Sequence, residues 1–144
     1  MENETMGRVT TGATVENFGD TWRAELGEIP GSQVRRVEIV DALVDTGATL
    51  LSLPISIIRQ LGLARVGTKR VRTSLGMGEA GLYAAVRLTI EGRTCTSDAL
   101  EVPDGTPALI GQLPLENLDF VVDLRNHKLI GNPAHGGEHM FELY

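Results

Sequence analysis

The stretch Ala42-Leu43-Val44-Asp45-Thr46-Gly47-Ala48-Thr49-Leu50-Leu51-Ser52-Leu53-Pro54 decides the fold of this chain of 144 residues. Residues 37–44 are rich in β-branched and apolar residues and predict a strand, and residues 50–53 form a second apolar run. Asp45 stands at the end of the first strand, where a purely structural strand would not be expected to hold a carboxylate. Thr46 adds a hydroxyl, Gly47 lets the backbone turn, and the small Ala48 leaves room beside the carboxylate. The stretch predicts a polar loop between two buried strands.

Two later segments belong with this loop. Ala108-Leu109-Ile110-Gly111 is an apolar run that predicts a second buried strand followed by a glycine. Residues 68–75 and 82–90 predict two long strands, and the second alternates apolar and polar side chains with the period of a half-buried strand. The link between these strands consists of Gly76, Met77, Gly78, Glu79, Ala80 and Gly81. We therefore expect a long hairpin with a supple, glycine-rich tip.

Together these segments resemble the retroviral type of aspartic protease, the retropepsins. Asp45-Thr46-Gly47-Ala48 resembles the active-site loop of that family, and Ile110-Gly111 matches the end of its apolar-apolar-Gly segment. The glycine-rich hairpin lies between them, in the order in which the family has its flap. The resemblance covers residues 34–131, which is most of the chain. It implies an all-β, closed β-barrel-like acid protease fold with one or two short helices.

The resemblance also implies a role for each matching residue. Asp45 would be the catalytic carboxylate, and Thr46 would hydrogen-bond across a dimer axis to lock two loops together. Gly47 would contact substrate through its backbone, and Ala48 would complete the loop. Residues 76–81 would form the flap that closes over a peptide, while Ile110 and Gly111 would support the Asp45 loop from behind.

Carboxylate chemistry then sets the number of chains at the site. Peptide hydrolysis by two carboxyl groups needs one ionised group to take a proton from water and one protonated group to donate to the carbonyl oxygen. The sequence holds a single Asp-Thr-Gly loop. We therefore expect a homodimer, with two copies of Asp45 beside a two-fold axis and a polypeptide as substrate.

Two positions depart from the retroviral pattern. Retroviral members usually carry Asp directly after the Ala and Arg directly after the second Gly, as an ion pair that braces the site. Here those positions are Thr49 and Gln112. The resemblance therefore points to the bacterial or cellular branch of retropepsin-like proteins.

The flanks of the core predict a single domain with additions at both ends. Residues 1–33 are predicted to form an N-terminal β-hairpin and loop, with strands at 8–16 and 21–26 and Trp22 as its packing anchor. Short helices are expected at 54–61, ended by Gly62, and at 113–118. A final hairpin spans 120–130. Residues 132–144 are predicted to form a loose tail that could add a dimer strand.

Composition argues against several other functions. The net charge of −6 and the lack of a dense Lys/Arg stripe disfavour nucleic acid as a partner. The chain shows no signal peptide and no apolar run of membrane-spanning length, so we expect a cytoplasmic protein without a membrane partner. His135 to His139 match the letters of an inverted zinc motif, but Gly136 and Gly137 disfavour the helix that such a site needs. No metal and no organic cofactor is expected.

Two alternatives accompany the protease hypothesis. The loop at Asp45 is also compatible with a structural Asx turn, in which the side chain caps its own backbone. A different class of function is a non-catalytic dimeric peptide-binding module that keeps a retropepsin-like groove. Residues 45–49 also fit the Asp-x-Gly-x-Thr phosphate loop of actin-like and sugar kinases. Those enzymes close two subdomains around a nucleotide and need far more than 144 residues, so this reading is rejected.

Overall fold

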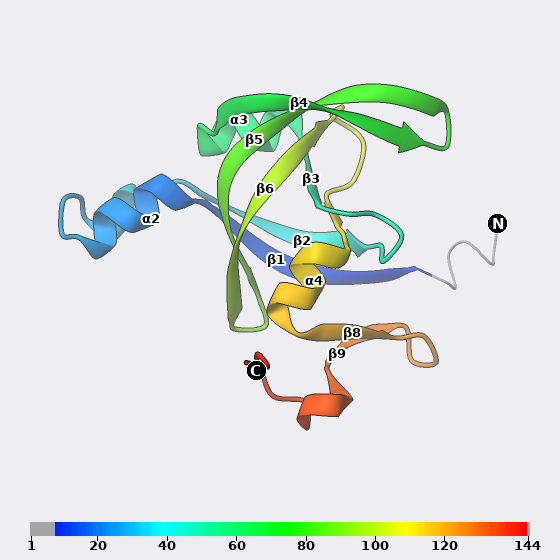
Figure 1. Cartoon of the computed structure of the whole chain (residues 1–144). Coiled ribbons are helices and arrows are strands. Elements are labelled where there is room, and N and C mark those ends of the chain that lie inside the picture. The colour runs from blue at the N-terminus through cyan, green and yellow to red at the C-terminus, as the bar shows by residue number, and fades with distance from the viewer. Residues whose placement is uncertain (1–7, 144) are drawn as a thin grey trace.

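The computed structural model describes residues 8–143, which form nine strands, three α-helices and two short 3-10 helices (Figure 1). The strands are β1 (Val9–Asn17), β2 (Arg36–Val44), β3 (Leu51–Pro54), β4 (Ala64–Thr73), β5 (Gly76–Ile90), β6 (Arg93–Val102), β7 (Leu109–Ile110), β8 (Phe120–Asp123) and β9 (Lys128–Gly131). The helices are α2 (Phe18–Glu25), α3 (Ile55–Leu61) and α4 (Gln112–Leu118), with 3-10 turns η1 (Gly31–Gln33) and η2 (Pro133–His135).

Seven strands form one sheet that closes on itself. Their order is β1-β2-β7-β3-β6-β5-β4, and β1 also pairs with β5, from Thr14 opposite Thr89 to Asn17 opposite Val86. Six strands therefore complete a ring, and in the described part of the chain β4 is attached outside it through β5 alone. Closure removes the free edges of the ring strands. The prediction of an all-β, closed β-barrel-like fold is confirmed, with one α-helix more than expected.

The core fills the ring with side chains from every strand around it. In β5 the buried residues Val86, Leu88 and Ile90 alternate with half-buried ones, as the period-two pattern predicted. The fully buried side chains also include Val15, Leu51, Leu53, Ile58, Leu61, Ile110, Leu115 and Leu118. The helices α3 and α4 thus contribute to the same core as the sheet. The described residues contain no helix that is long and apolar enough to cross a membrane.

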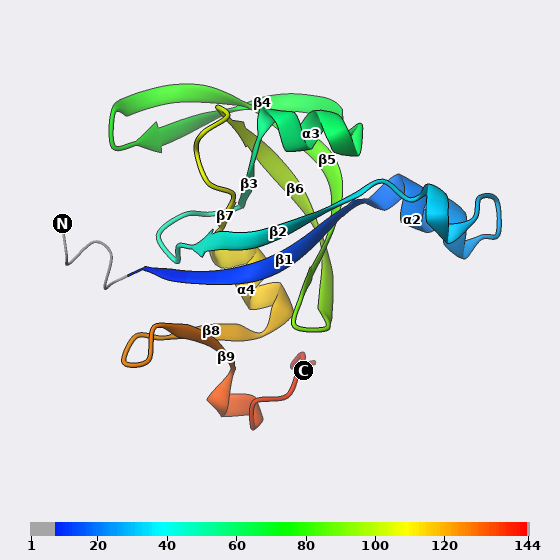
Figure 2. The same ribbon diagram turned by 180° about the vertical axis from the view of Figure 1, so that it is seen from behind.

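The predicted N-terminal β-hairpin is wrong, because the residues after β1 form the helix α2. The side chain of Asn17 accepts a hydrogen bond from the backbone N–H of Asp20 at 3.0 Å and so caps the first turn. Trp22 does not anchor a hairpin either, since 56% of its surface is exposed. Its ring lies beside that of Phe18, at a centroid distance of 6.2 Å. Figure 2 shows α2 projecting from the barrel as an arm.

The predicted loose tail is also wrong for the described residues 132–143. The guanidinium of Arg93 donates to the carbonyls of Leu118, Asp119 and Gly137, and its Cζ atom lies 4.4 Å from the centroid of the Phe120 ring. These bonds hold the tail against the end of α4 (Figure 1). The tail forms no strand among the described residues, and its use as a dimer strand stays a prediction.

Candidate active site

The Asp45 loop connects β2 to β3 at one end of the ring. Asp45, Thr46 and Gly47 are exposed, and Ala48 is half-buried. One carboxylate oxygen of Asp45, Oδ1, accepts a hydrogen bond of 2.9 Å from the backbone N–H of Gly47. The Asx turn that the sequence left open therefore forms, and it fixes the rotation of the carboxylate. Within residues 8–143, the other oxygen and the hydroxyl of Thr46 have no hydrogen-bond partner.

A second segment holds the loop from behind through its backbone. The N–H of Asp45 donates to the carbonyl of Ile110 at 3.0 Å, and the N–H of Gly111 donates to the carbonyl of Leu50 at 3.0 Å. The short strand β7 itself pairs parallel with β2 and antiparallel with β3, so it lies between the two strands that carry the loop. Both ends of the Asp45 loop are thus tied to one buried segment, and the loop is rigidly placed.

Backbone bonds join the loop to α4 around Thr49 and Gln112, the two positions that depart from the retroviral pattern. The N–H of Leu113 donates to the carbonyl of Thr49 at 3.0 Å, and the N–H of Gln112 donates to the carbonyl of Ala48 at 2.8 Å. These amides belong to the first turn of α4, which has no partner for them within the helix. The loop is therefore joined to α4 without an ion pair between side chains.

Gly111 makes this close approach possible. A Cβ added to it would lie 2.5 Å from the carbonyl oxygen of Leu50 and 2.8 Å from that of Ala48. Side chains do not tolerate such distances from backbone atoms. The glycine is therefore needed for space, since its φ of −90° and ψ of −172° are open to any residue.

The hairpin of β4 and β5 projects from the ring on the side of the Asp45 loop (Figures 1 and 2). The predicted position of its tip is wrong. Thr73 pairs with Gly76, so the turn consists of Ser74 and Leu75, and residues 76–81 form the first part of β5. Glycine at 76 is required by its φ of +115°. The side chains of Leu75 and Met77 are 97% and 57% exposed, so the tip presents apolar groups to solvent.

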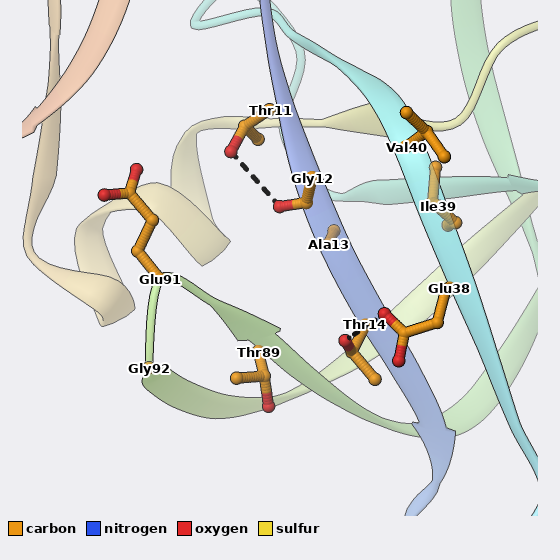
Figure 3. A pocket seen from close by; sticks show the side chains of 10 residues that line it. All are labelled: Thr11, Gly12, Ala13, Thr14, Glu38, Ile39, Val40, Thr89, Glu91 and Gly92. Carbon is orange, nitrogen blue, oxygen red and sulfur yellow. Dashed lines mark hydrogen bonds between the residues drawn. The ribbon is translucent and has the colours of Figure 1, made fainter.

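A surface hollow of about 650 Å³ lies elsewhere, against β1, β2 and the turn between β5 and β6 (Figure 3). It is lined by Thr11, Gly12, Ala13, Thr14, Glu38, Ile39, Val40, Thr89, Glu91 and Gly92. The hydroxyl of Thr14 already donates to Glu38 at 2.7 Å. None of the loop residues 45–48 lines this hollow, so it is separate from the candidate site.

A cluster at the end of α4 went undetected in the sequence. Asp119 is buried, and its carboxylate lies 2.7 Å from Nδ1 of His135. The other ring nitrogen of His135 lies 2.8 Å from Glu142. The pKa of His135 is raised above its usual value, mainly by its hydrogen bond to Asp119 and to a lesser extent by its hydrogen bond to Glu142. A charged imidazole can donate to both carboxylates, which binds the tail to α4.

The same bonds account for the histidines of the zinc-like motif. His135 contacts carboxylates, and Nε2 of His139 lies 3.0 Å from the carbonyl oxygen of Asn117. Among residues 8–143 no group of His, Cys, Asp and Glu side chains is arranged to hold a metal ion.

Comparison with known proteins was made at the levels of sequence and structure. No protein-family model and no curated protein matches the sequence. The structure is similar to EIAV protease complexed with the inhibitor HBY-793, with a TM-score of 0.50, 20% identity, and coverage of 77% of this chain and 88% of that chain. The chain has a retropepsin-like fold. It is also similar to the protease of simian foamy virus (mac), with a TM-score of 0.48, 16% identity, and coverage of 76% and 93% respectively.

The Asp45 loop and the hairpin of β4 and β5 are both parts of this retropepsin-like fold. At 20% identity the likeness to the EIAV enzyme establishes architecture alone. The roles of Asp45, of the hairpin and of a second copy therefore depend on the chemistry of this chain. Assignment to the bacterial or cellular branch stays a prediction.

Proposed function

We propose that the protein is an aspartic endopeptidase that acts as a homodimer, with two copies of Asp45 sharing a proton. One observation carries the proposal: on a retropepsin-like fold, an exposed carboxylate stands on a loop whose backbone is fixed from behind by Ile110 and Gly111. A structural Asx turn needs no such support. The EIAV protease, which has a similar fold, is known in complex with an inhibitor.

The proposed reaction is hydrolysis of a peptide bond by an activated water. One Asp45 carboxylate takes a proton from the water, whose oxygen then bonds to the peptide carbonyl carbon. The carboxyl group of the partner subunit's Asp45 donates its proton to the carbonyl oxygen, because two such groups side by side do not both ionise. Collapse of the tetrahedral intermediate breaks the C–N bond. The leaving nitrogen takes the proton that the first Asp45 had removed from water, and a hydroxyl of the intermediate returns a proton to the partner subunit's Asp45.

Pairing of two chains is supported by what one chain leaves incomplete. Oδ2 of Asp45 and the hydroxyl of Thr46 have no hydrogen-bond partner within the described residues, although both lie on a rigid loop. A two-fold axis beside the loop would bring each group against its copy. The Thr46 hydroxyls would then bond across the axis, and the hairpin of β4 and β5 would cover the bound peptide.

The experiment compares Asp45→Asn with a matched control. Asn keeps the shape of the side chain and its bond to Gly47 but cannot exchange a proton. The control is Asp41→Asn, since Asp41 is also exposed and lies on β2 outside the loop. An unfolded polypeptide is incubated with each protein from about pH 4 to 7, where a shared-proton dyad is competent. We expect Asp41→Asn to cleave like the original chain and Asp45→Asn to be inactive.

Sedimentation of the active sample tests the dimer. An active species of one chain would contradict the mechanism, and so would cleavage that survives Asp45→Asn. Peptide binding without cleavage in the original chain would instead support the non-catalytic binding module. A location in the cytoplasm stays a prediction.

A further inference from the structure

We propose that the basic residues of β4 make the enzyme prefer polypeptides with acidic side chains flanking the scissile bond. This inference names a substrate class and rests on the proposed function. The strand carries four basic residues, Arg65, Lys69, Arg70 and Arg72, all of which are exposed.

Charge is divided unevenly between this hairpin and the rest of the chain. Residues 64–81 carry these four basic side chains and one acidic side chain, Glu79, which is a net charge of +3. Since the whole chain has a net charge of −6, the remaining residues carry −9. A positive hairpin on an acidic body attracts acidic segments to the hairpin and repels them elsewhere.

Three of the four cations are available to a ligand. Arg65 is engaged, because it lies 3.5 Å from Glu101 and donates to the hydroxyl of Thr68 at 3.0 Å. Lys69, Arg70 and Arg72 form no ion pair with any other residue in the described part of the chain. Arg70 stands opposite Glu79 in the ladder without an ion pair.

The position of β4 makes these charges accessible to an extended peptide. Among residues 8–143, β4 is the last strand of the sheet and pairs only with β5, so one side of its backbone is left unpaired along ten residues. An extended peptide can add to such an edge through main-chain hydrogen bonds. Its side chains would alternate between the two faces of the hairpin, and so do the cations: Lys69 is on one face, and Arg70 and Arg72 are on the other.

A simpler role for the same charges is protection of the edge. Exposed edge strands commonly carry Lys and Arg so that they do not pair with one another. That role predicts aggregation when the charges are removed, and it predicts no dependence on the charge of a substrate. The two roles are therefore separated by measuring peptide selectivity.

The test uses two peptides with one cleavable centre and with Glu or Gln at the flanking positions. At about pH 6, where Glu is ionised, we expect kcat/KM for the Glu peptide to exceed that for the Gln peptide about tenfold at low ionic strength. The ratio of the two kcat/KM values should fall toward one at about 0.5 M salt, because salt screens the attraction between exposed charges. The preference for the Glu peptide should also vanish in the triple variant Lys69→Gln, Arg70→Gln, Arg72→Gln.

A matched triple variant controls for net charge. Arg23→Gln, Arg125→Gln and Lys128→Gln remove three exposed charges away from β4, and we expect the preference to remain. The reversed variant Arg70→Glu, Arg72→Glu should prefer a Lys-flanked peptide, a gain that misfolding cannot produce. Equal cleavage of the Glu and Gln peptides, or a preference that persists in the β4 triple variant, would overturn the inference.

Failure of the substrate inference is distinguishable from failure of the proposed function. Anisotropy of the labelled peptides with Asp45→Asn measures binding without cleavage. If the Glu peptide binds more tightly than the Gln peptide but the original chain cleaves neither, the charge preference is supported and the proposed endopeptidase function is contradicted. Cleavage without preference contradicts the preference alone. A single-stranded oligonucleotide of equal charge should not displace the Glu peptide, and displacement would mean that β4 serves a nucleic acid.

Discussion

Gly111→Ala is the perturbation that the structure constrains most closely. The added methyl group would lie 2.5 Å from the carbonyl oxygen of Leu50 and 2.8 Å from that of Ala48. Both contacts are with backbone, so no side chain can rotate away. β7 and the Asp45 loop must therefore separate by about 1 Å to reach ordinary van der Waals distance.

The cost follows from what that separation stretches. Overpacking a well-packed site costs about 1–3 kcal/mol, and two backbone hydrogen bonds, from Gly111 to Leu50 and from Gln112 to Ala48, lengthen with it. Ala restricts the unfolded chain and returns roughly 0.4–1 kcal/mol. With the lengthened hydrogen bonds, we expect the free energy of unfolding to fall by about 1–3 kcal/mol, which lowers Tm by about 3–12 °C.

The assay is urea and thermal unfolding of Gly111→Ala beside Gly31→Ala. An added Cβ at Gly31 meets nothing within 4 Å, and that backbone is not left-handed, so the control should be as stable as the original chain or slightly more stable. Peptide cleavage should fall about tenfold to a hundredfold, because a 1 Å displacement of a catalytic group has that effect. Equal Tm values for the two variants would refute the packing argument.

Three further predictions concern other parts of the molecule. Arg35→Gln leaves the buried carboxylate of Asp20 without its two bonds of 2.8 and 3.0 Å, so urea unfolding should show a loss of about 1–3 kcal/mol; an unchanged midpoint would contradict this. The pKa of His135 is raised by Asp119, so its stabilising effect is full below the unfolded value of 6.5 and is lost as pH rises through the higher folded value. Stability of the original chain should therefore decline over that window relative to His135→Gln, and parallel pH profiles would count against the link. Burial raises the pKa of the Cys95 thiol to about 11, so iodoacetamide should modify it slowly at about pH 8 until urea is added; rapid modification of the folded chain would show that the thiol is accessible.

Local patterns were sufficient to predict most of the ring. Alternation predicted β5, and Pro54 and Gly62 marked the two ends of α3 as the structure has them. The apolar run at 108–111 predicted β7. These elements follow periods of two or 3.6 residues, and their burial agrees with their propensity.

The errors arose where distant residues decide the outcome. Thr21 and Trp22 favour a strand by composition, but Asn17 caps a helix there. Asp20 in that helix is also bound by Arg35, which lies 15 residues later in the chain. Asn17 followed three residues later by an acidic residue was the available signal. The partners of Asp119 lie 13 to 21 residues away in sequence, so its burial had no local signature. The glycines of 76–81 suggested a turn, yet a two-residue turn at 74–75 leaves them within a strand.

The place of β7 in the sheet has a consequence for synthesis on the ribosome. Two residues, Leu109 and Ile110, are inserted between strands that were translated some sixty residues earlier, and they join β2 to β3. A growing polypeptide that has not reached this point lacks the middle of its sheet and the amides that hold Ala48 and Thr49. A nascent chain therefore cannot assemble the loop until Leu113 has been made.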